Sequence, residues 1–282
     1  MTIDHSWSDN YKTTEFLNVR LDLVRQCVVS GDAFGLEYLD REDMDGKTVL
    51  NVGCGTGIHD QEFLTRTGAR PKRYVLTDKS PAMVDEAVER VRPCLASVER
   101  HAISVDELSA QKVGRFDLIV CMHVLYHAPN PAQSIRSLAR LLADGGRLLV
   151  TTVSHDNNRE LLTLHNTTLR ERFGLEGSPP TCWRFDTANA MDVMGGAFHE
   201  VACHYKAADL RLPTVVDAMA YYRSLVYFKD ALECGVSGEL LAKQIEDDVA
   251  DVVARRGYFS CNKNSVTLIA SKPRASHLSS SG

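Results

Sequence analysis

Two patterns of hydrophobic and polar positions alternate along this chain. Short apolar runs that end at a glycine, an acidic residue or a turn predict strands buried on both faces. Longer segments with apolar residues three or four positions apart predict helices. The alternation predicts an α/β fold with a Rossmann-like, seven-stranded, mostly parallel sheet and helices on both faces. The expected strands are Thr48–Val52, Tyr74–Thr77, Ala102–Val105, Phe116–Cys121, Arg147–Val153, Val201–Lys206 and Ser265–Ser271.

The segments outside the sheet suggest the domain organisation. The first 45 residues are expected to form a helical lead-in, and another helical segment interrupts the chain before the last strand. Two further helices are expected over Asp156–Phe173 and Asp186–Met194. The expected domains are a helical cap over 1–45, a sheet domain over 46–271 with a helical insert at about 213–256, and a disordered serine-rich tail over 272–282.

Composition and charge narrow the class of partner. The 282 residues carry a net charge of −5, with Lys and Arg scattered among Asp and Glu, which argues against nucleic acid and anionic membrane as partners. No apolar run is long enough to span a bilayer, and the first ten residues are too polar for a secretory signal. The eight cysteines form no C-x-x-C pair, which favours core thiols in a reducing cytoplasm over a zinc or redox motif.

The clearest candidate for ligand binding is a glycine-rich loop after the first strand of the sheet. Gly53, Gly55 and Gly57 alternate with other residues, so the backbone can turn tightly and lie close to a ligand. Asp78 follows 21 residues after Gly57, at the end of the next strand, where a carboxylate can accept both hydroxyls of a ribose. Ile58 stands where dinucleotide-binding loops carry Gly or Ala, so a ligand with adenosine and an amino-acid tail fits better than NAD.

Together with later motifs, this loop resembles that of class I S-adenosylmethionine-dependent methyltransferases of the kind that modify small molecules. The matching motifs are Val49–Gly57, Val75–Asp78, Ser104–Asp106, Phe116–His127 and Leu142–Leu148, in the family's order. The resemblance implies S-adenosylmethionine as the cofactor, its ribose held by Asp78 and its adenine amino group contacted by Asp106. The implied cofactor-binding residues are Gly53, Cys54, Gly55, Gly57, Asp78, Lys79, Met83, Val105, Asp106 and Cys121.

One position departs from the family's pattern. Asn51 stands in the first strand of the sheet, where family members often carry an acid ahead of the glycine loop. An amide can hydrogen-bond an amino group or a water molecule, but it supplies no charge.

Candidate catalytic residues follow the fourth and fifth strands, because the crevice of an open α/β sheet lies at the carboxyl ends of its strands. His123 and His127 come after the fourth strand and His155 after the fifth, so each could accept a proton from the methyl acceptor. Methyl transfer from a sulfonium is an in-line displacement, for which alignment and desolvation can supply most of the catalysis. As alternatives, His123 and His127 frame the cofactor, and Asp156 caps a helix.

No metal is expected, because the fourth strand does not end in carboxylates. A facial triad of His155 and Asp156 with a distant His199 or His204 is the alternative.

Aromatic residues outside the strands are candidates for the substrate pocket. In the helical insert, Tyr222 lies among other aromatic residues, which suggests a lid over an apolar pocket. The alternative is that these rings pack the insert onto the sheet. The pocket candidates are Tyr11, Tyr126, Trp183 and Tyr222.

The hypothesis that unites these features is methyl transfer from S-adenosylmethionine to oxygen, nitrogen or carbon of a small-molecule acceptor. Three alternatives stay open. A tRNA or protein methyltransferase is disfavoured by the acidic composition, and a nicotinamide-dependent oxidoreductase is disfavoured by Ile58. A non-catalytic module that binds S-adenosylmethionine fits the glycine loop and Asp78 equally well.

Overall fold

The computed structural model describes residues 14–274, which form two compact units. The division differs from the sequence-based expectation, because the predicted lead-in is shared between the units and the chain after residue 153 contributes to both. Unit 1 comprises residues 14–35, 153–183 and 205–266, and unit 2 comprises residues 36–152, 184–204 and 267–274.

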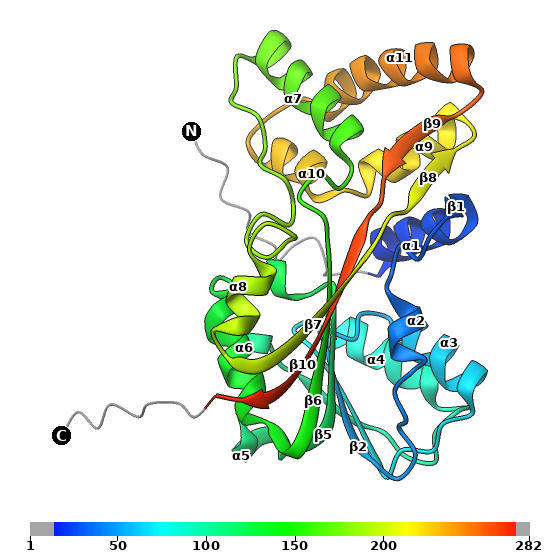
Figure 1. The fold of residues 1–282 in the computed structure, drawn as a ribbon. Coiled ribbons are helices and arrows are strands. Elements are labelled where there is room, and N and C mark those ends of the chain that lie inside the picture. The colour runs from blue at the N-terminus through cyan, green and yellow to red at the C-terminus, as the bar shows by residue number, and fades with distance from the viewer. Residues whose placement is uncertain (1–13, 275–282) are drawn as a thin grey trace, which may run out of the picture. The chain divides into compact units, whose positions relative to one another are not determined.

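Unit 2 is built on a seven-stranded sheet, which confirms the predicted fold class (Figure 1). Its strands are β2 (Thr48–Val52), β3 (Arg73–Asp78), β4 (Glu99–Ala102), β5 (Phe116–Met122), β6 (Leu142–Val153), β7 (Phe198–Lys206) and β10 (Ser265–Pro273). Their order is β4-β3-β2-β5-β6-β10-β7, and the four pairings from β4 to β6 are parallel. Parallel pairing places the carboxyl ends of these strands at one edge of the sheet, where ligands of open α/β folds bind.

Helices cover both faces of this sheet, as the alternating pattern predicts. They are α2 (Leu36–Leu39), α3 (Ile58–Thr67), α4 (Pro81–Val91), α5 (Ala110–Val113), α6 (Pro131–Arg140) and α8 (Ala190–Gly195). In Figure 1, α2, α3 and α4 lie on one side of the sheet and α5, α6 and α8 on the other. The core on the first side joins Phe63 and Val91 of the helices to Val49 and Leu76 of the sheet.

Local sequence signals place the start of α4. The Ser80 side chain accepts a hydrogen bond from Met83 N at 3.4 Å, and Pro81 occupies the first helical position. A proline there loses no intrahelical hydrogen bond, and its fixed φ suits the helix. Ser80 and Pro81 are thus helix-start signals that the sequence itself carries.

Two strand boundaries in unit 2 differ from the prediction. The third strand lies at Glu99–Ala102 rather than at 102–105, and Val105 begins the short 3-10 helix η1 (Val105–Glu107). The residues of β4 are largely exposed, so no apolar run marks the strand in the sequence. The fifth strand, β6, starts at Leu142 rather than at Arg147, because Gly145 and Gly146 lie at an irregularity within the strand pairing.

The predicted disordered tail begins within a strand. β10 extends through Pro273, and Lys272 forms an ion pair with Glu200. Arg274 Nε donates a hydrogen bond to the carbonyl oxygen of Gly195 at 2.9 Å. Residues 275–282 of the predicted tail lie outside the described residues.

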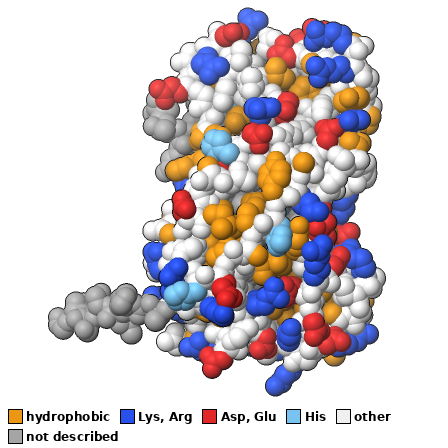
Figure 2. Space-filling view, in the orientation of Figure 1, with side chains coloured by type: hydrophobic (Ala, Val, Ile, Leu, Met, Phe, Trp, Pro, Cys, Tyr) orange, Lys and Arg blue, Asp and Glu red, His pale blue; other side chains and the backbone are white. Residues whose placement is uncertain are grey.

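Charged side chains of both signs are mixed on the surface. On the face that Figure 2 shows, Lys and Arg are interspersed with Asp and Glu, and no continuous basic patch covers this face. This distribution matches the scattered charges of the sequence. Within residues 14–274, no helix combines the length and the apolar character that a membrane crossing requires.

Unit 1 combines helices with a three-stranded antiparallel sheet. Its helices are α1 (Glu15–Cys27), α7 (Arg159–Phe173), α9 (Val215–Arg223), α10 (Val226–Glu233) and α11 (Gly238–Arg256). Its strands are β1 (Val28–Ser30), β8 (Asp209–Leu212) and β9 (Phe259–Asn262), in the order β1-β8-β9. The helical insert is confirmed as α9 to α11. The three strands were not predicted, because runs of three or four residues carry little periodic signal.

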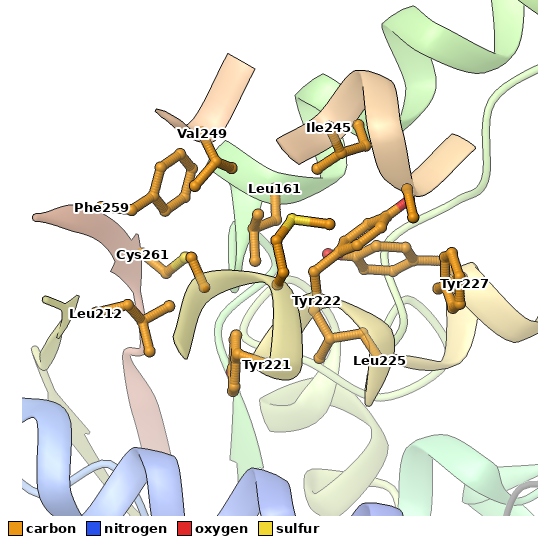
Figure 3. Close-up of a cluster of buried hydrophobic side chains, with 14 of the residues drawn as sticks. Leu161, Leu212, Tyr221, Tyr222, Leu225, Tyr227, Ile245, Val249, Phe259 and Cys261 are labelled. Atoms are coloured by element: carbon orange, nitrogen blue, oxygen red, sulfur yellow. The ribbon is translucent and has the colours of Figure 1, made fainter. Parts of the chain in front are cut away.

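Aromatic side chains of the insert fill the core of unit 1 (Figure 3). Tyr221 and Tyr222 are 0% exposed and Tyr227 is 2% exposed, so these rings pack within the core of unit 1. His165 is buried with them. Its Nδ1 lies 2.8 Å from Tyr222 Oη, and its Nε2 lies 3.3 Å from Ser178 Oγ, so both ring nitrogens have partners.

We predict that acidification destabilises the protein through His165. Burial lowers the pKa of His165 to about 4, below the ordinary value of about 6.5. Between these two pH values the unfolded chain binds more protons than the folded chain, so stability is lost as pH falls through this window. The His165 contribution to the free energy of unfolding should fall by up to about 3 kcal/mol, measured by urea denaturation at several pH values. His165→Asn should flatten this dependence, and an identical pH dependence in both proteins would contradict the assignment.

Candidate functional site

The glycine loop joins β2 to α3 at the carboxyl edge of the sheet. Gly53, Gly55 and Gly57 have φ angles of 67°, 53° and 70°, in the left-handed region that favours glycine. Cys54 N donates a hydrogen bond to Thr77 O at 2.9 Å, and Gly57 N donates one to Cys54 O at 3.0 Å. The loop therefore forms a tight turn bonded to the end of β3, as the glycine spacing predicts.

Two of these glycines also leave no space for a side chain. A Cβ on Gly53 would lie 2.2 Å from Val124 Cγ2, and a Cβ on Gly57 would lie 2.7 Å from Ala87 Cα in α4. Both separations are far below van der Waals contact. The loop is thus packed directly against α4 and the segment that follows β5.

Asp78, the last residue of β3, holds the loop through its carboxylate. Oδ2 accepts a hydrogen bond from Gly55 N at 3.1 Å, and Oδ1 accepts one from Ser80 N at 2.9 Å. Burial raises the pKa of Asp78, while these backbone hydrogen bonds and the charge of Lys79 oppose the rise. Each oxygen keeps acceptor capacity after one hydrogen bond, so the carboxylate can still accept ligand hydroxyls.

The segment after β5 lies beside the loop. Cys121 pairs with Val52, the last residue of β2, and Val124 packs on Gly53. Between them, His123 has a φ of 57°, and its N–H donates to Thr151 O at 2.9 Å. A left-handed backbone at a residue other than glycine is uncommon and concentrates at functional sites.

Tyr126 and His127 follow in the 3-10 helix η2 (Leu125–His127). Their rings lie 4.4 Å apart at 57°, and both residues are half-buried. Because the carboxyl ends of parallel strands meet at one edge of the sheet, His123, Tyr126 and His127 lie at the same edge as the glycine loop and Asp78.

The other residues implied by the family resemblance differ in exposure. Met83, Cys121 and Val105 are 1%, 0% and 7% exposed, so their side chains pack in the core of unit 2. Burial raises the pKa of the Cys121 thiol, which is neutral there. Lys79 and Asp106 are exposed, and Asp106 accepts a hydrogen bond from a serine of α6. The contribution of these five residues to cofactor binding stays a prediction.

A buried polar cluster beneath the loop was not predicted. Asn51 Nδ2 and Tyr74 Oη each donate a hydrogen bond to Asp60 Oδ1 at 2.6 Å, and all three residues are buried. Burial raises the pKa of Asp60, and the hydrogen bonds from Tyr74 and Asn51 oppose the rise. An acid is therefore present next to the atypical Asn51, but it comes from the first turn of α3. The amide of Asn51 donates to this acid, a role that the sequence interpretation did not consider.

Unit 1 carries further residues singled out from the sequence. His155 and Trp183 are exposed, whereas Tyr222 is completely buried in the aromatic core. Tyr11 lies outside the described residues.

The alternative that Asp156 caps the following helix is wrong. α7 begins at Arg159, and its N-terminal flanking residue is Asn158, which has a φ of 56°. The Asp156 carboxylate instead accepts hydrogen bonds from Ser154 Oγ at 2.6 Å and from Asn262 Nδ2.

The metal triad has no counterpart in the described structure. Within residues 14–274, no three His, Cys, Asp or Glu side chains come together in a group that could hold a metal ion.

Comparison with known proteins identifies the fold and the family. A family model described as a methyltransferase domain matches residues 32–192. The YcgJ protein of Bacillus subtilis has a similar fold, with a TM-score of 0.53, 17% identity, and alignment over 85% of this chain and 98% of that chain.

Two relatives are named ubiquinone biosynthesis O-methyltransferase. The one from Xanthomonas oryzae pv. oryzae is 37% identical over 120 residues, which are 42% of this chain and 48% of the relative. The one from Pseudomonas paraeruginosa is 27% identical over 183 residues, which are 60% of this chain and 76% of the relative. The chain thus spans about half the length of the first of these relatives.

We predict that exchanging the partners Asn51 and Asp60 preserves stability, whereas changing Asn51 alone does not. Asn51→Asp would place two carboxyl groups at the present contact of 2.6 Å. Their repulsion should lower the free energy of unfolding by about 2–4 kcal/mol at pH 7. The double variant Asn51→Asp/Asp60→Asn restores one donor and one acceptor and should regain most of this loss in urea denaturation. A double variant no more stable than Asn51→Asp would contradict the pairing.

Proposed function

The chain belongs to the methyltransferase-domain family, and we propose that it transfers a methyl group from S-adenosylmethionine to oxygen, nitrogen or carbon of a small molecule. The observation that carries this proposal is the hydrogen bond of 3.1 Å between Gly55 N and Asp78 Oδ2. It joins a left-handed glycine turn to the acid of the next strand. A ribose needs such an acid, and an amino-acid tail needs close approach to such a backbone.

The residues at this edge fit the cofactor chemically. S-adenosylmethionine, when bound, would supply a methyl group activated by its sulfonium. Asp78 would accept hydrogen bonds from the ribose hydroxyls with its remaining lone pairs. The first turn of α3 has Gly57 as its N-terminal flanking residue and no side-chain cap, so its N–H groups can donate to the amino-acid tail.

A histidine would accept the proton of a hydroxyl or amine acceptor. Three positions are candidates: His123 is supported by its left-handed backbone, His127 by its place beside the loop, and His155 by its exposure just after β6. Tyr126 and the exposed Trp183 would contact the acceptor. Because methyl transfer is an in-line displacement, most of the rate enhancement would come from alignment of the acceptor atom with the methyl group.

The names of the relatives favour a hydroxyl acceptor among the three atoms. Two similar proteins are named O-methyltransferases of ubiquinone biosynthesis, which supports an oxygen nucleophile on a small molecule. The mixed charges of the face in Figure 2 and the net charge of −5 weigh against a tRNA substrate. We also propose a cytoplasmic location, which the widely spaced cysteines support.

We predict that Asp78→Asn weakens the binding of S-adenosylhomocysteine at least about tenfold, because charged hydrogen bonds to the ribose would be lost. Isothermal titration measures the affinity. Asp117→Asn is the matched control, because Asp117 lies near the start of β5, at the opposite edge, where it accepts hydrogen bonds from Thr48 N and Oγ1 at 2.8 Å. Equal affinity in the two variants would contradict the role of Asp78.

We predict that His155→Gln lowers methyl transfer to a hydroxyl acceptor about a hundredfold while S-adenosylhomocysteine binds normally, as for loss of a general base. Incorporation of an isotopically labelled methyl group into a panel of phenols and amines measures turnover. His199→Gln, at an exposed histidine of unit 2, is the control. Unchanged turnover would remove His155 and leave His123 and His127. A protein that binds the cofactor product but methylates no member of the panel would favour the non-catalytic module.

A further inference from the structure

The strand β7 lies at one edge of the seven-stranded sheet and has an unprotected middle. Among the strands that residues 14–274 form, β10 is its one neighbour, and none of its nine residues is proline or glycine. No side chain of the segment Val201–Cys203 carries a charge. Ala202 and Cys203 are both exposed, although successive residues of a strand point to opposite faces. Such an edge offers backbone N–H and C=O groups to a further strand.

The opposite edge of the same sheet, formed by β4, is protected. Its four residues include Glu99, Arg100 and His101. Arg73 Nη2 lies 2.6 Å from Glu99 Oε2, and Arg100 forms an ion pair with Asp85. Short strands and charged side chains are two means by which proteins prevent pairing at a sheet edge. The two edges therefore differ, because β4 has both of these protections and the middle of the longer β7 has neither.

The order of the side chains along β7 is complementary to itself when the strand is reversed. Glu200 precedes the uncharged segment and His204 follows it, with Ala202 midway between them, so all three share one face of the strand. In an antiparallel pair with Ala202 opposite its own copy, Glu200 would stand opposite His204 at two symmetric places, and Val201 opposite Cys203. A parallel copy in the same register would instead set Glu200 beside Glu200, which is unfavourable.

Contacts within the chain hold Glu200 and His204 in position. The His204 ring stacks on Tyr38 of α2, with ring centroids 4.4 Å apart and planes at 20°. A stack engages the face of the ring, so the ring nitrogens lie at its edge. Glu200 accepts a hydrogen bond from Ser271 Oγ at 2.9 Å and pairs with Lys272. A carboxylate has about four acceptor sites, so Glu200 can also accept a hydrogen bond from an imidazole N–H.

We propose that the partner of this edge is a second copy of the chain, paired β7 to β7 in antiparallel orientation about a twofold axis at Ala202. The pairing satisfies backbone groups of both edges and adds two contacts between Glu200 and His204. It joins the two seven-stranded sheets into one continuous sheet. Because each sheet has one unprotected edge, the assembly closes at two copies. The inference is independent of the proposed methyl transfer.

Analytical ultracentrifugation of the full chain over a range of concentrations tests the pairing. The wild type is compared with Ala202→Glu, with Ala202→Lys and with an equimolar mixture of these two variants. Position 202 faces its own copy at the twofold axis, so each variant alone sets like charges opposite each other. Ala102→Lys is the matched control, because Ala102 is an exposed alanine of β4, at the opposite edge of the same sheet.

We expect the wild type and Ala102→Lys to sediment as dimers. Ala202→Glu and Ala202→Lys should each raise the dissociation constant of the dimer at least about tenfold, because like charges directly opposite each other are destabilising. The equimolar mixture should regain the dimer, because the introduced charges are then opposite in sign. A wild type that is monomeric at every concentration overturns the inference. So does a dimer that neither Ala202 variant weakens, or a mixture that regains nothing.

A disulfide test applies if an Ala202 variant does not fold by circular dichroism. Cys203 and Cys234 are the exposed cysteines of the described chain, so Cys234→Ser leaves Cys203 as the reporter. In this background, Val201→Cys sets a thiol opposite Cys203 of the second copy, and oxidation by diamide should give a disulfide-linked dimer on a non-reducing gel. Cys234→Ser alone, with a valine opposite Cys203, should give far less. Equal yields from the two proteins overturn the proposed register.

Discussion

The close approach of the backbone at Gly53, Gly55 and Gly57 to its neighbours is the constraint on which the candidate site depends. Positive φ angles let the chain reverse within this loop, and the missing Cβ atoms let it touch Val124 and Ala87. That contact brings Gly55 N within hydrogen-bond distance of Asp78, and the parallel register sets Val52 beside Thr77 and Cys121. The carboxyl ends of β2, β3 and β5 thus lie close together, because the glycines of this loop carry no side chain that would separate them.

Two buried polar groups in this protein are compensated in different ways. Asp60 receives two short hydrogen bonds, from Asn51 and Tyr74, and so supports the loop from below. His165 is kept neutral by burial and places both ring nitrogens on neighbouring hydroxyls. Both groups are therefore satisfied within the fold.

The sequence predicted the features that local chemistry determines. β2, the glycine loop, Asp78 and the start of α4 follow from apolar runs, glycine spacing and capping, and the structure has them at the expected places. The edge strand β4 was misplaced because its side chains are exposed, and β1, β8 and β9 were missed because each is so short. The hydrogen bond between Asn51 and Asp60 depends on tertiary contacts, which no spacing rule reports. The sequence indicated which residues of unit 1 are candidates for contact with the methyl acceptor. It did not indicate where those residues lie in three dimensions.

The position of β10 has a consequence for how the chain is assembled during synthesis. In the sheet, β10 lies between β6 and β7, yet it follows the other six strands of this sheet in the sequence. The strands β2 to β6 can pair with one another once residue 153 has emerged, since these strands all lie within residues 48–153. β7, by contrast, must wait with unsatisfied backbone groups until residues 265–273 arrive. The nascent sheet therefore carries an open edge at β6 during translation of more than a hundred residues, a natural point for chaperone contact or for misassembly.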